Sequence, residues 1–487
     1  MLFPTVTFAV FFAAVFIASW LLMPRFRLWK LFMVGAGCVF YGWWDWRGVG
    51  LLALFALGDF GFAALIVRGR RPAARRAALV AGLVFNLGVL GLFKYYDFFV
   101  TSAANMLRAV GLGAAPPLLD LALPIGISFL TFRMISYLVD VYRGLPAVQP
   151  ALDTPTATAD TLLDLSVYVA FFPYLLLGPI TRAGEFLPQL RRPRDPRRID
   201  ASRAWFLILA GLAKKLLIAD YVATHLVTGV FTTPASYSSL ETLIAIWGYA
   251  VQIYCDFSAY ADIAIGLALL LGFELPDNFN APYTARSVRD FWRRWHMTLS
   301  SWIRDYLYIP LGGNRKGTGR TYLNLMIAML LAGLWHGAGW TFLVWGGLHG
   351  AGLCYDHWRA ARRTGLGEPA LREGRGAVAW QRFATFQFVA FAWVFFPTRA
   401  DFASPWSILA RLFTGWGHPN AALTPALLLV IALGVAIQYV PRRAIEAGEI
   451  RFSRLAPVLQ GIGLACGLFL INVLGPQGVA AFLYFRF

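Results

Sequence analysis

The sequence predicts an all-α polytopic integral membrane protein with about ten to thirteen membrane segments, some of them re-entrant. Of its 487 residues, 59% are hydrophobic, 16% aromatic and only 14% charged, whereas soluble domains usually carry about 25% charged residues. Apolar runs follow one another along the whole chain. Many of them approach the roughly 20 residues that a helix needs to cross about 30 Å of hydrocarbon.

The apolar runs define the predicted segments in chain order. The first, Val6–Met23, has no charge, no basic flank before it and no small-residue cleavage site, so we expect a retained helix rather than a signal peptide. The other candidates are Leu31–Trp44, Leu51–Val67, Ala77–Phe93, Leu118–Val139, Leu162–Ile180, Trp205–Ile218, Leu240–Cys255, Ile263–Phe273, Tyr322–Leu334, Trp340–Cys354, Phe383–Phe396, Leu423–Val440 and Leu455–Leu474. Several are short, so we expect some to be tilted or re-entrant.

The net charge of +18 is concentrated in short loops between the apolar runs. This distribution is typical of cytoplasmic loops beside an anionic membrane surface and argues against nucleic-acid binding. It places the N-terminus outside. If Leu118–Val139 and Leu162–Ile180 both crossed the membrane, the basic loop at 191–203 would lie on the wrong face, so we expect one of them to enter and return. The residues best suited to interrupt these helices are Pro124, Pro173 and Pro179.

The central segment Phe291–Pro310 reads FWRRWHMTLSSWIRDYLYIP. Its aromatic and basic residues predict one helix that lies at the membrane interface rather than spanning. On such a helix His296 and Ser300 would share one face. The residues that recur at near-helical spacing are Trp292, Trp295, Leu299, Trp302 and Tyr306.

Three histidines lie where chemistry is plausible. His336 sits among glycines inside an apolar run, and an ionisable residue at membrane depth is a functional candidate, although a hydrogen bond between helices is an alternative. For His296 the alternative is an interfacial residue paired with lipid headgroups. His349 follows in the same apolar block, where packing is the favoured interpretation and cavity lining stays open. For His225, His357 and His418 we expect surface positions.

Two carboxylates, Asp256 and Asp262, lie in another apolar run. We expect a structural ion pair with arginines of the central region, with channel lining as the second interpretation. The sequence contains no G-x-S-x-G elbow, H-E-x-x-H zinc motif or Walker loop. Covalent serine chemistry, zinc chemistry and phosphoryl transfer therefore have little support, and we predict no metal site.

The motifs carry a recognisable resemblance that covers essentially the whole chain. The run Asp290–Arg315, DFWRRWHMTLSSWIRDYLYIPLGGNR, resembles the hallmark segment of the membrane-bound O-acyltransferases. The segment Gly333–Ala338, GLWHGA, is similar to their second hallmark. The bacterial branch, which contains alginate O-acetyltransferase membrane subunits and teichoic-acid D-alanylation proteins, shares further segments. These are Leu177–Arg182, Tyr254–Gly266 and the C-terminal Phe482–Phe487.

The resemblance implies a ring of helices around a central tunnel, formed by one membrane domain over residues 1–487. We expect N-terminal helices at 1–160, a core with both hallmark histidines at 161–355 and C-terminal helices at 356–487. In this family the second-hallmark histidine lies in the tunnel, which assigns that role to His336 as general base. The family's other polar site corresponds to His296, which would orient a substrate or stabilise oxyanion charge. Residues expected to line the tunnel are Trp335, Trp302, Tyr306, Asp256 and Asn314.

The implied function is O-acetylation of an exported polysaccharide such as alginate. The donor would be a cytoplasmic thioester, acetyl-CoA, as a substrate rather than a bound cofactor, drawn by the basic loops. The expected location is the bacterial inner membrane, with an extracytoplasmic acyltransferase as partner. Alternatives are D-alanyl transfer, lipid or protein acylation, a proton-coupled transporter and a non-catalytic scaffold.

Overall fold

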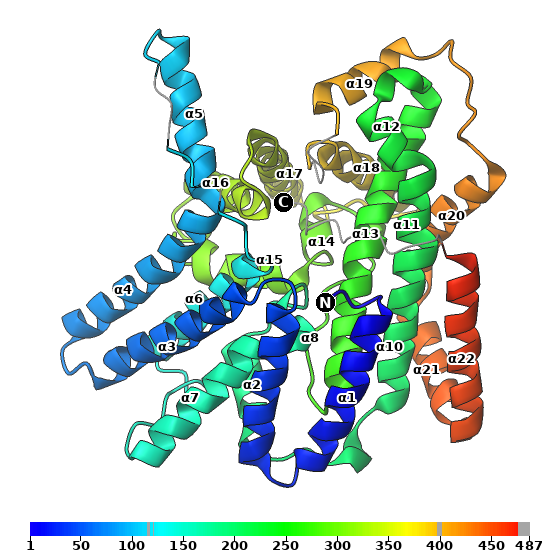
Figure 1. Ribbon diagram of the computed structural model, residues 1–487. Helices are drawn as coiled ribbons and strands as arrows, with labels where there is room; N and C mark the ends of the chain where they lie inside the picture. The colour runs from blue at the N-terminus through cyan, green and yellow to red at the C-terminus, as the bar shows by residue number, and fades with distance from the viewer. Residues whose placement is uncertain (114–116, 120, 397–401, 476–487) are drawn as a thin grey trace. The chain divides into compact units, whose positions relative to one another are not determined.

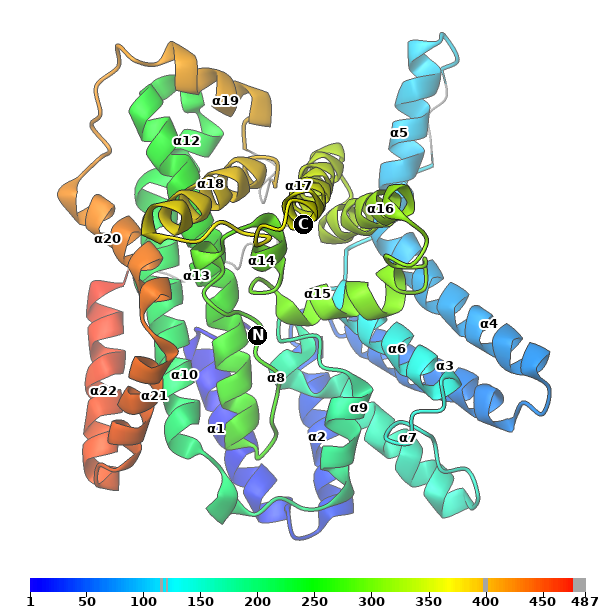
Figure 2. The same ribbon diagram turned by 180° about the vertical axis from the view of Figure 1, so that it is seen from behind.

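The computed structural model describes residues 1–113, 117–119, 121–396 and 402–475. Within these ranges the regular elements are all helices, and no residue forms a β-strand (Figures 1 and 2). The predicted all-helical fold class is therefore confirmed. The aromatic run Phe482–Phe487, one of the segments behind the family resemblance, lies outside the described residues.

The chain forms two compact units. The first unit contains residues Met1–Ala201 and Leu267–Pro276, and the second contains Ser202–Gly266 and Asp277–Phe487. The helices of the first unit are α1 Val6–Leu22, α2 Phe26–Gly42, α3 Arg47–Arg68, α4 Pro72–Leu90, the π-helix η1 Gly91–Tyr95, α5 Tyr96–Ala109, α6 Ile127–Tyr142, α7 Pro155–Ala170, α8 Phe172–Leu175, α9 Ala183–Phe186 and the 3₁₀ turns η2 Leu187–Arg191 and η3 Pro196–Arg198.

The second unit contains nearly all of α10 and most of α13, and it carries both hallmark motifs. Its helices are α10 Ala201–Ala213, the π-helix η4 Lys214–Ala219, α11 Asp220–Val222, the π-helix η5 Ala223–Val227, α12 Thr228–Thr232, α13 Ser239–Leu270, α14 Val288–Trp292, α15 Met297–Ile303, the π-helix η8 Arg304–Tyr308, α16 Thr318–His336, α17 Trp340–Gly365, α18 Arg375–Trp393, α19 Pro405–Thr414, α20 Pro425–Ala436, α21 Arg442–Ser453 and α22 Pro457–Leu474, with 3₁₀ turns at η6 Pro234–Ser236, η7 Pro282–Thr284 and η9 Ile437–Tyr439.

Several helices are long and apolar enough to cross a membrane. Among the described residues, length and composition identify four, and a pair bent by 91° after α20 makes a fifth if it is one span (Figure 2). The ten to thirteen segments expected also include re-entrant and tilted ones, and most of the other apolar runs form shorter helices. The four are Arg47–Arg68, Pro72–Ala109, Ser239–Leu270 and Pro457–Leu474.

Proline interrupts the two segments whose topology conflicts with the basic loop at 191–203. Helix α6 begins at Ile127, shortly after Pro124, and the described residues that precede it in that segment are not helical. Helix α7 ends at Ala170, and the short helix α8 begins at Phe172 with Pro173 as its second residue. The chain around Pro179 is irregular before α9. The predicted interruptions are confirmed, because proline lacks the N–H that continues a helix.

Helix starts follow their local sequences. Thr154, Ser404 and Thr424 each precede a proline, and their hydroxyl oxygens accept a hydrogen bond from the backbone N–H three residues later at 3.1, 3.2 and 3.2 Å. A hydroxyl cap followed by proline at the first helical position satisfies exposed backbone donors and presets the backbone angle. These positions therefore define where α7, α19 and α20 begin.

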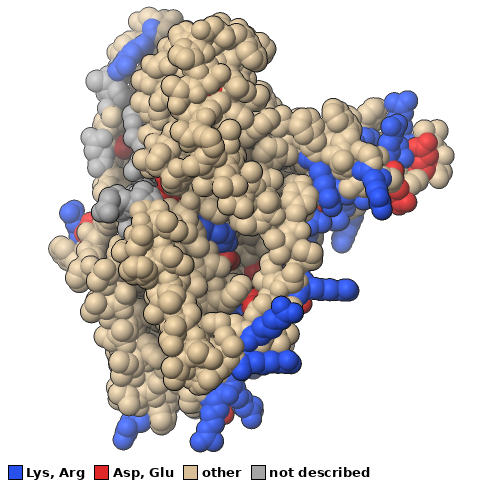
Figure 3. All heavy atoms as spheres, turned by 90° about the vertical axis from the view of Figure 1, so that its right-hand side faces the viewer, with Lys and Arg blue, Asp and Glu red and all other residues tan. Residues whose placement is uncertain are grey.

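Charged side chains are unevenly distributed over the surface. On the face drawn in Figure 3, Lys and Arg stand in separate groups and wide areas carry no charged side chain. Large exposed apolar side chains on α22, such as Val458 at 72% and Phe469 at 66%, agree with a lipid-facing helix.

Candidate active site

The predicted central helix is wrong, because the chain breaks between α14 and α15. His296 lies in the break with φ 41° and ψ 57°, a left-handed conformation that is uncommon outside glycine. The backbone N–H of Asn280 donates to the Arg294 carbonyl at 2.9 Å, and that of Met297 donates to the Asn278 carbonyl at 2.9 Å. These bonds to the segment that contains Asn278 and Asn280 hold the chain in a non-helical conformation at His296.

Asn278 also fixes the proton position on His296. Its Oδ1 accepts from the backbone N–H of Thr298 at 3.3 Å and from the Thr298 hydroxyl at 2.9 Å, and it lies 3.0 Å from Nδ1 of His296. Since an amide oxygen only accepts, Nδ1 of His296 donates to it. Full burial lowers the pKa of His296 to about 3, so the ring is neutral at pH 7 and its Nε2 carries a lone pair.

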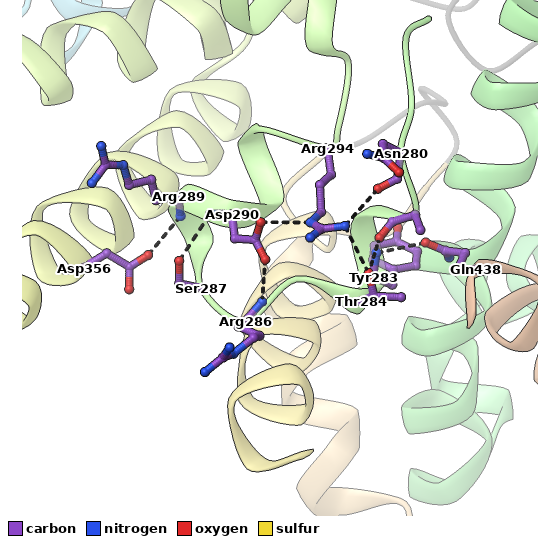
Figure 4. A network of polar contacts seen from close by, with 11 residues as sticks. Asn280, Tyr283, Thr284, Arg286, Ser287, Arg289, Asp290, Arg294, Asp356 and Gln438 are labelled. Atoms are coloured by element: carbon purple, nitrogen blue, oxygen red, sulfur yellow. Dashed lines mark hydrogen bonds and ion pairs between the residues drawn. The ribbon is translucent and has the colours of Figure 1, made fainter. Parts of the chain in front are cut away.

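A network of polar contacts holds the chain that leads to this break (Figure 4). The carboxylate of Asp290 accepts from Nε of Arg294 at 2.8 Å and from the backbone N–H of Arg286 at 3.0 Å. The backbone N–H of Arg289 donates to Asp356 of α17 at 2.9 Å. Asp290 and Arg294 of the first hallmark, together with the preceding Arg286 and Arg289, therefore fasten α14 to its neighbours.

Helices α16 and α17 pack closely because a glycine of each helix lies against the backbone of the other. A Cβ atom on Gly333 would lie 2.2 Å from the Phe342 carbonyl oxygen, and one on Gly346 would lie 2.4 Å from the Met329 oxygen. Both distances are too short for any side chain. This contact brings the second hallmark at the end of α16 against the face of α17.

His336 lies in an aromatic cluster at that contact. It is 2% exposed, and its ring lies 4.8 Å from Trp335, 5.0 Å from Trp345 and 5.0 Å from Phe396, in edge-to-face arrangements. The ring of His296 lies 6.1 Å from Trp335. The two hallmark histidines are far apart in sequence, and both contact the ring of Trp335.

His349, for which the sequence favoured packing and left cavity lining open, belongs to the same cluster. It is 0% exposed and lies 4.7 Å from the Trp345 ring, which also contacts His336. Its Nδ1 accepts a hydrogen bond from Nε1 of Trp292 at 3.2 Å. The sequence signal was the spacing of four residues between Trp345 and His349, which places both on one helix face.

The other predicted lining residues lie in different surroundings. Trp302 and Tyr306 pack on each other at 5.4 Å, one turn apart. Asn314 is exposed in the turn before α16. Asp256 is 2% exposed and pairs with Lys215 at 3.0 Å.

The prediction that arginines pair with Asp256 and Asp262 is wrong, because their partners are lysines. Lys215 pairs with Asp256 and, at 2.7 Å, with Asp220, while Lys214 pairs with Asp262 at 2.6 Å. Both lysines come from the π-helical turn η4, whose widened backbone places two consecutive side chains along α13. Sequence periodicity does not reveal such a turn.

Comparison with known proteins places this arrangement in a family. The sequence profile of the membrane-bound O-acyltransferase family matches residues 158–360, which include both hallmarks. The chain is 39% identical over 442 residues to a probable alginate O-acetylase of Pseudomonas aeruginosa, covering 90% of this chain and 79% of that protein. It is 38% identical over 388 residues to a peptidoglycan O-acetyltransferase of Helicobacter pylori, covering 75% and 70%.

A teichoic acid D-alanyltransferase of Streptococcus thermophilus is less similar, at 27% identity over 293 residues, covering 56% of this chain and 68% of that protein. The relatives with higher identity are both O-acetylating proteins, and each is covered over more than two thirds of its length. The hallmark segments, the all-helical fold and these similarities agree, and the chain is a membrane-bound O-acyltransferase that belongs to the family of that name.

Proposed function

We propose that this O-acyltransferase takes an acetyl group from a cytoplasmic thioester such as acetyl-CoA and delivers it across the inner membrane for O-acetylation of an exported polysaccharide such as alginate. The observation that carries the proposal is the buried cluster that brings His296 and His336 together around Trp335. The higher identity to O-acetylating relatives than to the D-alanyltransferase supports acetyl as the transferred group.

In this mechanism His336 is the general base. Its ring accepts the proton of the acceptor hydroxyl while the hydroxyl oxygen attacks the thioester carbonyl carbon. The C–O bond forms, the C–S bond breaks, and the imidazolium returns its proton to the leaving thiolate. An imidazole suits both steps because its ordinary pKa of about 6.5 lies near working pH. The aromatic rings around His336 exclude water that would hydrolyse the thioester.

His296 has a different part in the proposal. With Nδ1 donating to Asn278, its Nε2 accepts a hydrogen bond and orients a hydroxyl or amide of a substrate. Stabilisation of an oxyanion requires a donor, so that expected role does not fit this tautomer. The left-handed backbone at His296 costs on the order of 1–2 kcal/mol, which is typical of residues held for function.

The acetyl group passes to an extracytoplasmic acyltransferase partner that modifies the polymer. The basic loops attract the anionic phosphates of the donor on the cytoplasmic side. The competing functions are D-alanyl transfer, lipid or protein acylation, and proton-coupled transport through the buried group of Lys215, Asp220 and Asp256. Because that lysine is matched by carboxylates at 2.7 and 3.0 Å, we assign the group to structure.

The test is the acetyl content of the secreted polymer in cells that carry His336→Ala. We expect acetylation to be lost at a normal membrane level of the protein. His418→Ala, at an exposed position, is the matched control and should leave acetylation unchanged. Normal acetylation in the His336 variant would overturn the proposal and redirect attention to transport, whereas a changed lipid or D-alanyl content would identify a different acyl acceptor or donor.

A further inference from the structure

His349 is a buried histidine that the proposed reaction does not yet use. It lies on α17 with 0% exposure, one helical turn after Trp345, and its Nε2 is buried with no hydrogen-bond partner among the described residues. A buried polar group left without a partner costs about 1–3 kcal/mol. Such a group in a folded protein calls for an explanation, and binding of a ligand or an ordered water is one.

The contact with Trp292 determines which atom of His349 carries the proton. The indole N–H of tryptophan can only donate, so Nδ1 of His349 accepts at 3.2 Å. A neutral imidazole that accepts at Nδ1 holds its proton at Nε2. His349 therefore presents a fixed N–H donor, whereas His296 presents an acceptor at the same ring position.

A shared tryptophan links this donor to the proposed base. Trp345 contacts the ring of His336 at 5.0 Å and that of His349 at 4.7 Å, and Trp393 contacts His349 at 6.3 Å. The Nε1 of Trp345 is also buried without a hydrogen-bond partner in the described part of the chain. Two N–H donors thus lie in the aromatic cluster that contains the proposed base: one on Trp345, whose ring contacts His336, and one on His349, whose ring contacts the same Trp345. In such apolar surroundings a hydrogen bond to a developing negative charge is strongest.

We propose that the Nε2–H of His349 donates a hydrogen bond to the carbonyl oxygen of the acyl group that is transferred at His336, with Trp292 as the positioning residue that holds its tautomer. This inference rests on the proposed function. When the acceptor oxygen attacks the carbonyl carbon, the electron pair of the C=O bond moves to this oxygen, and the donor stabilises it. The pair returns as the C–S bond breaks, and His349 keeps its proton throughout.

The experiment uses inside-out membrane vesicles supplied with radiolabelled acetyl-CoA, and it measures kcat and KM for acetyl transfer. His349→Phe removes the donor and keeps an aromatic ring, and we expect kcat to fall about 100-fold with KM little changed, as for loss of one oxyanion donor. His349→Gln places an amide N–H near the lost Nε2 and should restore most of the rate. Trp292→Phe should lower kcat less, because His349 stays but its tautomer is no longer fixed.

Matched controls separate this role from packing. His357→Phe changes another histidine of α17, and Trp380→Phe changes a tryptophan that is 65% exposed; both should leave kcat unchanged. If His349→Phe transfers acetyl as fast as His357→Phe, or if Gln is as inactive as Phe at equal protein level, the inference is wrong. If the His349→Phe protein does not accumulate, the kcat values of wild type, His349→Gln and Trp292→Phe are compared instead. A lowered kcat in Trp292→Phe together with a nearly normal kcat in His349→Gln supports the donor role. An unchanged kcat in Trp292→Phe contradicts it. Absence of transfer by the wild type would instead reject the proposed function.

Discussion

The second unit contains two kinds of buried nitrogen-bearing side chain, and their surroundings are opposite in character. Lys215 is fully enclosed, yet carboxylates stand 2.7 and 3.0 Å from its ammonium group. The histidines of the cluster are equally buried but lie among aromatic rings, with Trp345 between the contacts of His336 and His349. The comparison teaches that burial alone does not indicate function. An ammonium group held by carboxylates indicates a structural role, whereas histidine rings packed among aromatic side chains agree with the proposed contact to a substrate.

The largest effect on stability is expected from removing Lys215, which is ion-paired with Asp220 and Asp256. Lys215→Met leaves Asp220 and Asp256 as buried carboxylates without their lysine, and loss of one partner of a buried ion pair costs about 3–5 kcal/mol. We expect a strong decrease in thermal stability of the protein in detergent. Lys214→Met is the control, because Lys214 is partly exposed and its loss should cost less. Equal stability of the two variants would contradict a structural role for Lys215.

The next effect tests the close contact that assembles the cluster. Gly346→Ala forces its Cβ to 2.4 Å from a backbone oxygen of α16, so the helices must move apart, at a cost of about 1–3 kcal/mol. We expect reduced stability together with reduced acetyl transfer in vesicles. The neighbouring Gly347→Ala meets only a leucine methyl at 3.8 Å and should behave like the wild type. If both variants retain full activity, the tight contact does not position His336.

A smaller effect concerns the pH dependence of stability. His296 lies outside the four span candidates, and its pKa falls from 6.5 to about 3 on folding, so below pH 6.5 the unfolded chain binds the extra proton. The contribution of neutral His296 to the free energy of unfolding is fully present above pH 6.5. At pH 5 the free energy of unfolding is lower by about 2 kcal/mol, since each pKa unit corresponds to about 1.4 kcal/mol. Thermal unfolding from pH 7 to pH 5 measures this slope. His296→Gln should flatten it, and an unchanged slope would contradict a buried neutral His296.

The sequence predicted the helical fold class, because long apolar runs determine it, and it named His336 and His296 as candidates from local motifs, which stays a prediction. It missed the break at His296, because the aromatic residues around it recur at helical spacing. The bonds that open the helix come from Asn278 and Asn280, which are distant from that pattern. It also gave no sign of the hydrogen bond from Trp292 to His349, because these residues lie on different helices. Local periodicity records neither long-range hydrogen bonds nor the π-helical turn that brings the lysines to Asp256 and Asp262.

The central claim is that His336 is the base for acyl transfer from a cytoplasmic thioester. The most direct measurement is the transfer of radiolabelled acetyl from acetyl-CoA by inside-out vesicles that contain wild-type or His336→Ala protein at equal levels. The account predicts a rate lower by about 10²–10⁴-fold in the variant, the usual contribution of a positioned general base. Transfer by the variant at the wild-type rate would contradict it.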